Sequence, residues 1–161
     1  MSNSINTNKA PRRKVRFETI DHAIAEARRI ATMVNSGTAQ YSGNWNAGQI
    51  LNHVAAWAEY AYVANPMKAP WFIKLLVRPF KRKFLNSGLP AGRIIPNIPG
   101  GTLATEKVPT DAALARFETS FARLKTDPPT QPSPVFGMMT HEEAIKLNLR
   151  HAELHMSFVK N

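Results

Sequence analysis

Two histidines stand four residues apart near the end of the chain, in the segment LRHAELHMSF. Positions four apart on an α-helix lie about one turn apart on the same face, so His151 and His155 can offer two nitrogens to one metal ion. A third histidine, His53, lies on the apolar face of another expected helix, NAGQILNHVAAW. Three histidine ligands with an open fourth position are typical of catalytic zinc sites. Three neutral ligands would leave a divalent ion its full charge, which lowers the pKa of a bound water or thiol.

The alternative is that each histidine is structural and packs at the edge of the core with one hydrogen bond. Burying several imidazoles among Leu and Phe side chains is costly unless they are paired or ligated, which favours a metal site. Spacing alone nevertheless leaves both interpretations open. Imidazole suits Zn²⁺, Ni²⁺, Fe²⁺, Co²⁺ and Cu²⁺, so the ligand type does not identify the metal.

Other polar residues near the three histidines are not expected to bind the metal themselves. Glu153 is two positions from His151, about 200° around the helix, so its carboxylate should point away from the site and supply no base. His141 should be exposed at the start of its helix, and spacing suggests no partner for His22. Ligating histidines usually donate their second N–H to a carbonyl or carboxylate. The polar candidates near the site, among which the sequence does not choose, are Asn52, Glu59, Tyr60, Glu118 and Asn148.

Four segments show helical periodicity, over about residues 19–34, 46–62, 110–125 and 140–158. Asn46 with Gln49 and Thr140 with Glu143 form capping-box patterns at the starts of the second and fourth segments, and Trp45 with Ile50 would form a hydrophobic staple. Nothing indicates a sheet. The sequence therefore predicts an all-α fold, a four-helix bundle with a long insertion between its second and third helices.

The chain has 161 residues, which predicts a single domain over residues 18–161, preceded by a basic, loosely ordered arm over residues 1–17. There are no cysteines, which excludes disulfides and thiolate metal sites. The N-terminus has no apolar stretch after its charges, and no run approaches the roughly 18 apolar residues of a membrane span, so we expect a cytoplasmic protein.

The insertion of about 47 residues is far longer than the usual link between bundle helices. Its first half, APWFIKLLVRPFKRKFL, should form one or two short helices interrupted at Pro79. Its second half is rich in glycine and proline and should be an ordered loop. We expect this loop, residues 86–109, to form a pocket wall in which Arg93 can bind an anionic group.

Basic residues are concentrated in two parts of a chain whose net charge is +10. Residues 1–17 and 60–105 carry twelve Lys and Arg residues and no acidic one. The second stretch also holds an apolar stripe, which we expect to dock on the bundle. Contact with a membrane, with nucleic acid or with an anionic substrate remains an alternative. The stripe consists of Trp71, Phe72, Leu75, Leu76, Phe80 and Phe84.

The order of the segments NWNAGQILNHVAAW and PVFGMMTHEEAIKLNLRHAELH resembles that of the DinB/YfiT-like superfamily of metalloenzymes. More narrowly, PMKAPWFIKLLVRPFKRKFLNSGLPAG is similar to a branch known only as a domain of unknown function. The resemblance spans about residues 13–158. It implies a four-helix bundle with metal ligands at His53, His151 and His155, and an activity such as thiol transfer with a low-molecular-weight thiol. It is also compatible with a homodimer.

The sequence thus favours a metal-dependent enzyme that acts on a small-molecule substrate by thiol transfer or metal-assisted hydrolysis. Zn²⁺ or Ni²⁺ is the expected cofactor, with a low-molecular-weight thiol as a second candidate. The alternative is a metal-free binding or interaction protein whose basic, aromatic insertion contacts an anionic partner, such as nucleic acid or a membrane surface.

Overall fold

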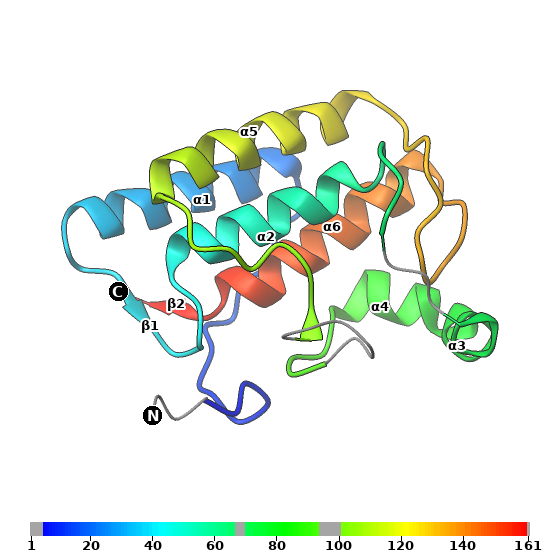
Figure 1. Ribbon diagram of the computed structural model, residues 1–161, viewed down its shortest axis with the longest axis horizontal. Helices are drawn as coiled ribbons and strands as arrows, with labels where there is room; N and C mark the ends of the chain where they lie inside the picture. Colours follow the sequence, from blue (N-terminus) through cyan, green and yellow to red (C-terminus); the bar gives the residue numbers. More distant parts are fainter. Residues whose placement is uncertain (1–4, 67–69, 94–100, 161) are drawn as a thin grey trace.

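The computed structural model describes residues 5–66, 70–93 and 101–160, and its fold is all-α, as predicted. α1 packs against α5 and α6, and α2 packs against the same two helices. The long insertion lies between α2 and α5. The four long helices, called the bundle below, lie around one core (Figure 1) and are α1 (Ile20–Asn35), α2 (Ala47–Glu59), α5 (Thr110–Thr126) and α6 (His141–Met156).

Side-chain caps set where three of these helices begin. The Thr19 hydroxyl accepts a backbone N–H at the start of α1. Both predicted capping boxes are present, Asn46 with Gln49 at α2 and Thr140 with Glu143 at α6. An N-cap of this kind contributes about 1 kcal/mol to stability. The starts of the two helices that carry the histidines are therefore determined locally.

The core is formed by apolar residues from all four bundle helices. Phe117 and Phe121 of α5 stack at its centre, with ring centroids 4.0 Å apart. Ile30 of α1, Leu51 of α2 and Leu149 of α6 are fully buried as well. Burial of each such side chain stabilises the fold by about 2 kcal/mol, so the core holds α2 and α6 in a fixed relation.

A short antiparallel strand pair, which the sequence did not predict, joins the end of the chain to the link between α1 and α2. β1 (Gln40–Tyr41) pairs with β2 (Val159–Lys160), with Tyr41 opposite Val159. α6 ends at Met156, two residues earlier than predicted, because the chain turns there to enter β2. A two-residue strand is too short to show an alternating pattern, which is why the sequence carries no sign of it.

The last part of the basic arm is bound to the bundle. Arg13 donates to the carboxylate of Glu26 on α1 at 2.5 Å. Phe17 is buried, and its backbone N–H donates to Glu153 on α6 at 2.6 Å. Arg150 pairs with Glu153 at 2.8 Å and also donates to the Phe17 carbonyl. These contacts secure the entry of the chain into α1.

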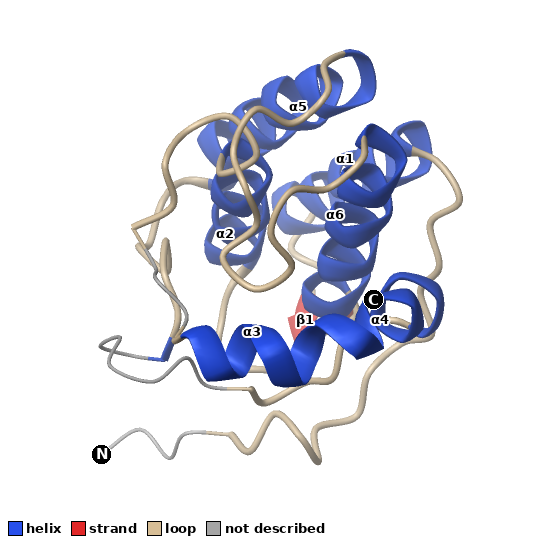
Figure 2. Cartoon of the chain, turned by 90° about the vertical axis from the view of Figure 1, so that its right-hand side faces the viewer, coloured by secondary structure: helices blue, strands red, loops and turns tan. Residues whose placement is uncertain are grey.

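The insertion begins with two short helices joined by a turn of 3₁₀-helix. α3 (Trp71–Val77) leads into η1 (Arg78–Phe80), which contains Pro79, and then into α4 (Lys81–Ser87). The predicted interruption at Pro79 is therefore confirmed. α4 packs against α6 and buries Leu85, whereas α3 crosses one end of the molecule outside the bundle (Figure 2).

The prediction that the apolar stripe of the insertion docks on the bundle is wrong for most of its residues. Phe84 is partly buried near Phe136, but the other five large apolar side chains are exposed. The physical reason is the position of α3, which lies outside the bundle and packs mainly against η1, so its apolar side chains have no core surface to cover. None of the helices in the described ranges is long and apolar enough to cross a bilayer.

Candidate metal centre

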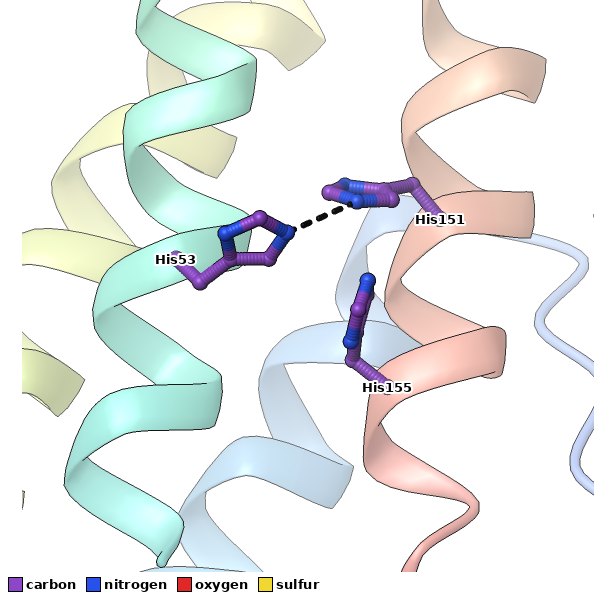
Figure 3. A group of neighbouring side chains, drawn as sticks. All are labelled: His53, His151 and His155. Carbon is purple, nitrogen blue, oxygen red and sulfur yellow. Dashed lines mark hydrogen bonds between the residues drawn. The ribbon is translucent and has the colours of Figure 1, made fainter. Parts of the chain in front are cut away.

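The structure brings the three predicted histidines together between α2 and α6. His53 projects from the middle of α2 and is 2% exposed. His151 and His155 project from successive turns of α6 toward it (Figure 3). The helical spacing explains the α6 pair, but only the packing of α2 against α6 brings His53 to them.

The imidazole nitrogens of the three histidines lie close enough together to share one metal ion. Nε2 of His53 and Nε2 of His151 are 3.2 Å apart. Each of the three rings offers one nitrogen, and these atoms lie within 4.8 Å of one another. Histidine nitrogens lie about 2.0–2.1 Å from a tetrahedral zinc ion, which separates two of them by about 3.3 Å. The His53–His151 separation thus matches that of two zinc ligands, and the three histidines together could hold a divalent metal ion.

A backbone carbonyl sets the orientation of His53. Its Nδ1 atom lies 2.7 Å from the carbonyl oxygen of Leu103. A carbonyl oxygen can only accept, so Nδ1 carries the proton and Nε2 presents its lone pair to the other two histidines. This is the second contact that metal-binding histidines usually make. Nδ1 of His151 is buried and has no hydrogen-bond partner within the described ranges.

Burial keeps the three imidazoles neutral. Desolvation lowers the pKa of His53 to about 4 and outweighs the opposing effects of the Leu103 carbonyl and the charge of Glu106. Burial, followed by the charge of His53, lowers the pKa of His151 well below its usual value. The pKa of His155 is lowered by burial and by the charges of the other two rings. At neutral pH all three rings are therefore in the form that binds metal ions.

Two tryptophans line the histidine cluster. The Trp45 ring stacks on His155, with centroids 5.2 Å apart and planes 13° apart. The centroid of the Trp57 ring lies 5.9 Å from that of His53 and 5.5 Å from that of His151. Its Nε1 is buried and has no hydrogen-bond partner among the described residues. Trp57 follows His53 by one helical turn, so spacing could have identified it, whereas Trp45 was predicted only as part of a helix staple.

The glycine- and proline-rich loop forms one wall of the site, as far as it is described. Beyond Leu103, the carbonyl of Thr105 accepts from the side chain of Gln49 at 2.9 Å. At Gly48 the loop is so close to α2 that an added Cβ would lie 2.1 Å from the Val108 carbonyl oxygen. Residues 94–100 of the predicted wall lie outside the described residues. Arg93 is exposed, and its role in binding an anion stays a prediction.

The other polar candidates bind elsewhere. Asn52 accepts from Arg116 at 2.6 Å, and Arg116 also forms a two-pronged ion pair with Glu59. Asn148 donates to the backbone of its own helix. Glu118 pairs with an arginine of α1. The sequence could not predict the hydrogen bond from His53 to the Leu103 carbonyl, because every residue has a backbone carbonyl whatever its type.

The remaining titratable residues of α6 and the first helix are outside the cluster. Glu153 points away from it, as predicted, and binds the N-terminal arm. His22 is exposed on α1. The prediction that His141 is exposed is wrong, because its Nε2 atom contacts the Leu124 carbonyl at 2.8 Å and the residue is partly buried. The end of α5 covers this ring.

A hollow of about 620 Å³ lies between the N-terminal arm, the end of α4 and the side of α6 that carries Glu153. None of the three histidines lines it. Its arginines are largely engaged with protein groups, as Arg13 is with Glu26 and Arg150 is with Glu153. The convergence of donor atoms, rather than the size of a hollow, therefore identifies the candidate site.

The comparisons with known proteins identify a family and no relative of known activity. No curated protein and no solved structure matches the chain significantly. A family described as "Protein of unknown function (DUF1569)" matches residues 9–161, which include the basic arm from Lys9 onward, the whole bundle and all three histidines. The chain therefore belongs to the DUF1569 family of proteins of unknown function.

Proposed function

We propose that this protein is a cytoplasmic, metal-dependent enzyme of the DinB-like type. In it, His53, His151 and His155 bind one divalent ion, Zn²⁺ or Ni²⁺. The observation that supports the proposal most is the convergence of three neutral imidazole nitrogens within 4.8 Å. Placing one buried and two partly buried imidazoles side by side without a ligand would be costly, and a shared cation offsets that cost.

The proposed reaction is thiol transfer or metal-assisted hydrolysis of a small-molecule substrate. When bound, a divalent ion with three neutral ligands would lower the pKa of a coordinated low-molecular-weight thiol or of water. Among the described residues no carboxylate joins the three histidines, and Glu153 points away. A Glu base on the histidine-bearing helix, as in metalloproteases, is therefore not part of the proposal.

The surrounding residues position the ligands and limit access of water. The Leu103 carbonyl holds His53 in the tautomer that leaves Nε2 available. The stacked Trp45 ring restrains His155. The Nε1–H of Trp57, which has no hydrogen-bond partner among the described residues, can donate to an oxygen of a bound substrate, because it lies beside His53 and His151. Trp57 would then be a substrate-binding residue.

Metal content tests the proposal directly. The untagged protein, purified without chelator, is expected to contain about one Zn²⁺ or Ni²⁺ per chain by elemental analysis. His53→Ala, His151→Ala and His155→Ala should each lose it, whereas His22→Ala, which changes an exposed histidine outside the cluster, should retain it. Full metal content in all three cluster variants would refute the assignment.

Activity requires a separate test, because metal binding alone does not show catalysis. The metal-loaded protein should consume low-molecular-weight thiols with electrophilic acceptors, or hydrolyse small esters or amides, and His151→Ala should abolish the turnover. Trp57→Phe, which keeps the ring but removes the N–H, should raise KM or lower kcat without changing metal content. Loss of metal in Trp57→Phe would instead assign Trp57 a structural role.

A metal-free interaction protein is the competing function. It predicts no bound metal even after incubation with divalent ions and dialysis. In that case the buried histidine cluster would be a structural element held by the His53–His151 contact and the two tryptophans. Elemental analysis separates the two functions whatever the insertion binds.

A further inference from the structure

The end of the molecule formed by α3 and η1 presents a cluster of large apolar side chains to solvent. α3 has no buried residue, and only the following helix, α4, is anchored in the bundle. We call this cluster the α3 patch. Its members and their exposed fractions are Trp71 (76%), Leu75 (66%), Leu76 (64%), Phe80 (53%) and Phe72 (49%).

The spacing makes these side chains one surface. Trp71 and Leu75 lie one helical turn apart, as do Phe72 and Leu76, so the four form adjoining rows on α3. Phe80 extends the surface into η1. Single exposed apolar residues are ordinary, but a contiguous apolar surface usually marks a binding site.

The patch lies within a strongly basic segment. Residues 60–105 contain no acidic residue. Lys81 pairs with Glu143 of α6 at 2.6 Å, which helps to anchor α4. None of the other ion pairs recorded for the described residues involves a basic residue of this segment. The basic residues beside the patch, apart from Lys81, are Lys74, Arg78, Arg82 and Lys83.

An occupant must satisfy both the apolar side chains and the cations. A second copy of the chain would cover the apolar side chains but would bring two sets of positive charges together. A nucleic acid would neutralise the cations and could stack on Trp71, but it would leave Leu75 and Leu76 in water. A bilayer with anionic headgroups offers an apolar interior and a negative surface at once.

We propose that the α3 patch binds the surface of a bilayer that contains anionic lipids. The apolar side chains enter the boundary between headgroups and acyl chains, and the neighbouring Lys and Arg side chains contact the headgroups. The contact is peripheral, because no helix in the described part of the chain can span a bilayer. It requires no metal and is independent of the proposed enzyme activity.

Vesicle binding of the intact protein tests the proposal. The protein should sediment with vesicles of phosphatidylcholine and phosphatidylglycerol, and much less with phosphatidylcholine alone. Binding should weaken as the salt concentration rises, because exposed charges are then screened. Each Lys or Arg near an anionic surface changes affinity about fivefold, so Arg82→Gln with Lys83→Gln should weaken binding roughly 25-fold.

The apolar part of the surface needs its own variant and a matched control. Leu75→Ser with Leu76→Ser should also weaken vesicle binding, and because both side chains are exposed the variant should unfold at the same urea concentration as the wild type. Arg28→Gln with Lys125→Gln removes the same charge as the basic variant from α1 and α5, and should bind vesicles like the wild type. Trp71 gives a direct signal, a blue shift of its emission on anionic vesicles that Trp71→Phe removes.

Four results would overturn the proposal. One is the absence of binding to anionic vesicles at low salt. Another is unchanged vesicle binding in the Leu75, Leu76 variant. The third is a dimer in light scattering that this variant dissociates, together with no vesicle binding, which would assign the patch to a second copy of the chain. Binding to single-stranded nucleic acid without vesicle binding would contradict it in the same way.

Discussion

At the scale of single residues, His53 is the ligand whose chemical form is most fully determined. Its Nδ1 atom donates to the Leu103 carbonyl, and burial lowers the pKa of its ring to about 4. His151 differs, because its Nε2 lies 3.2 Å from the unprotonated Nε2 of His53 and so carries the proton, while its buried Nδ1 has no partner among the described residues. We therefore expect His53 to be preset as a ligand and His151 to adapt when a metal binds.

The protonation of His53 can be observed directly in the metal-free protein. We predict that ring-nitrogen NMR shows the proton on Nδ1 at neutral pH and a neutral ring until the pH falls to about 4. The reason is that burial disfavours the imidazolium while the carbonyl fixes the tautomer. His53→Gln assigns the signal. Titration of this ring near its ordinary pKa of 6.5, or a proton on Nε2, would contradict the described site.

At the scale of elements, the site depends on how closely the loop over residues 101–109 approaches α2. Gly48 allows that approach, because its missing Cβ leaves room for the Val108 carbonyl. The same loop supplies the carbonyls of Leu103 and Thr105. Gly48 lies in the first turn of α2, where a glycine normally lowers helix stability. Here it is needed because only a residue without a Cβ leaves room for the loop.

Gly48→Ala should therefore destabilise the protein and weaken metal binding. In an open helix this change would stabilise by up to about 1 kcal/mol, but here the new Cβ would lie 2.1 Å from a backbone oxygen, so the loop must move. Urea unfolding and metal titration measure the two effects. Leu103→Ala is the control, because it keeps the carbonyl and should bind metal more tightly than Gly48→Ala. An increase in the free energy of unfolding of Gly48→Ala would contradict the prediction.

At the scale of the whole molecule, the candidate metal centre and the α3 patch lie in different parts of the fold. The histidine cluster lies between α2 and α6, whereas the α3 patch lies on helices outside the bundle. The packing of α2 against α6 must also offset the free-energy cost of removing one buried and two partly buried imidazoles from water. That cost should appear as a dependence of global stability on pH.

The free energy of unfolding of the metal-free protein should fall as the pH decreases from about 6.5 to about 4. In this range the unfolded chain binds protons at His53, His151 and His155 while the folded protein does not, because burial lowers all three pKa values. His53 alone would contribute roughly 3 kcal/mol across this range. Glu26, whose pKa is lowered below 4.5, acts at lower pH.

Urea unfolding at a series of pH values measures this dependence. His53→Gln should make the profile less steep between about pH 6.5 and 4, because it removes one of the three contributions, whereas His22→Gln should leave it unchanged. Added Zn²⁺ should raise stability at neutral pH and lose its effect as protons compete for the nitrogens. Identical profiles for the wild type and His53→Gln would show that the ring is not buried as described.

Local signals in the sequence predicted the four bundle helices and the shared face of two of the three histidines. The capping boxes at Asn46 and Thr140 and the helical periodicity predicted α1, α2, α5 and α6 to within a few residues, because caps and amphipathic faces depend on neighbours along the chain. The spacing of His151 and His155 predicted their shared face for the same reason. Pro79 likewise predicted the break in the insertion.

Tertiary structure alone decided the rest, because it depends on groups far apart in the sequence. His53 meets the α6 pair through core packing, and the Leu103 carbonyl binds it from a loop whose residue types reveal nothing of that contact. Trp45 stacks on His155 for the same reason. The exposure of α3 was the opposite of the prediction, because α3 lies outside the bundle and none of its residues is buried. Periodicity shows that a helix has an apolar face, but only packing shows what that face meets.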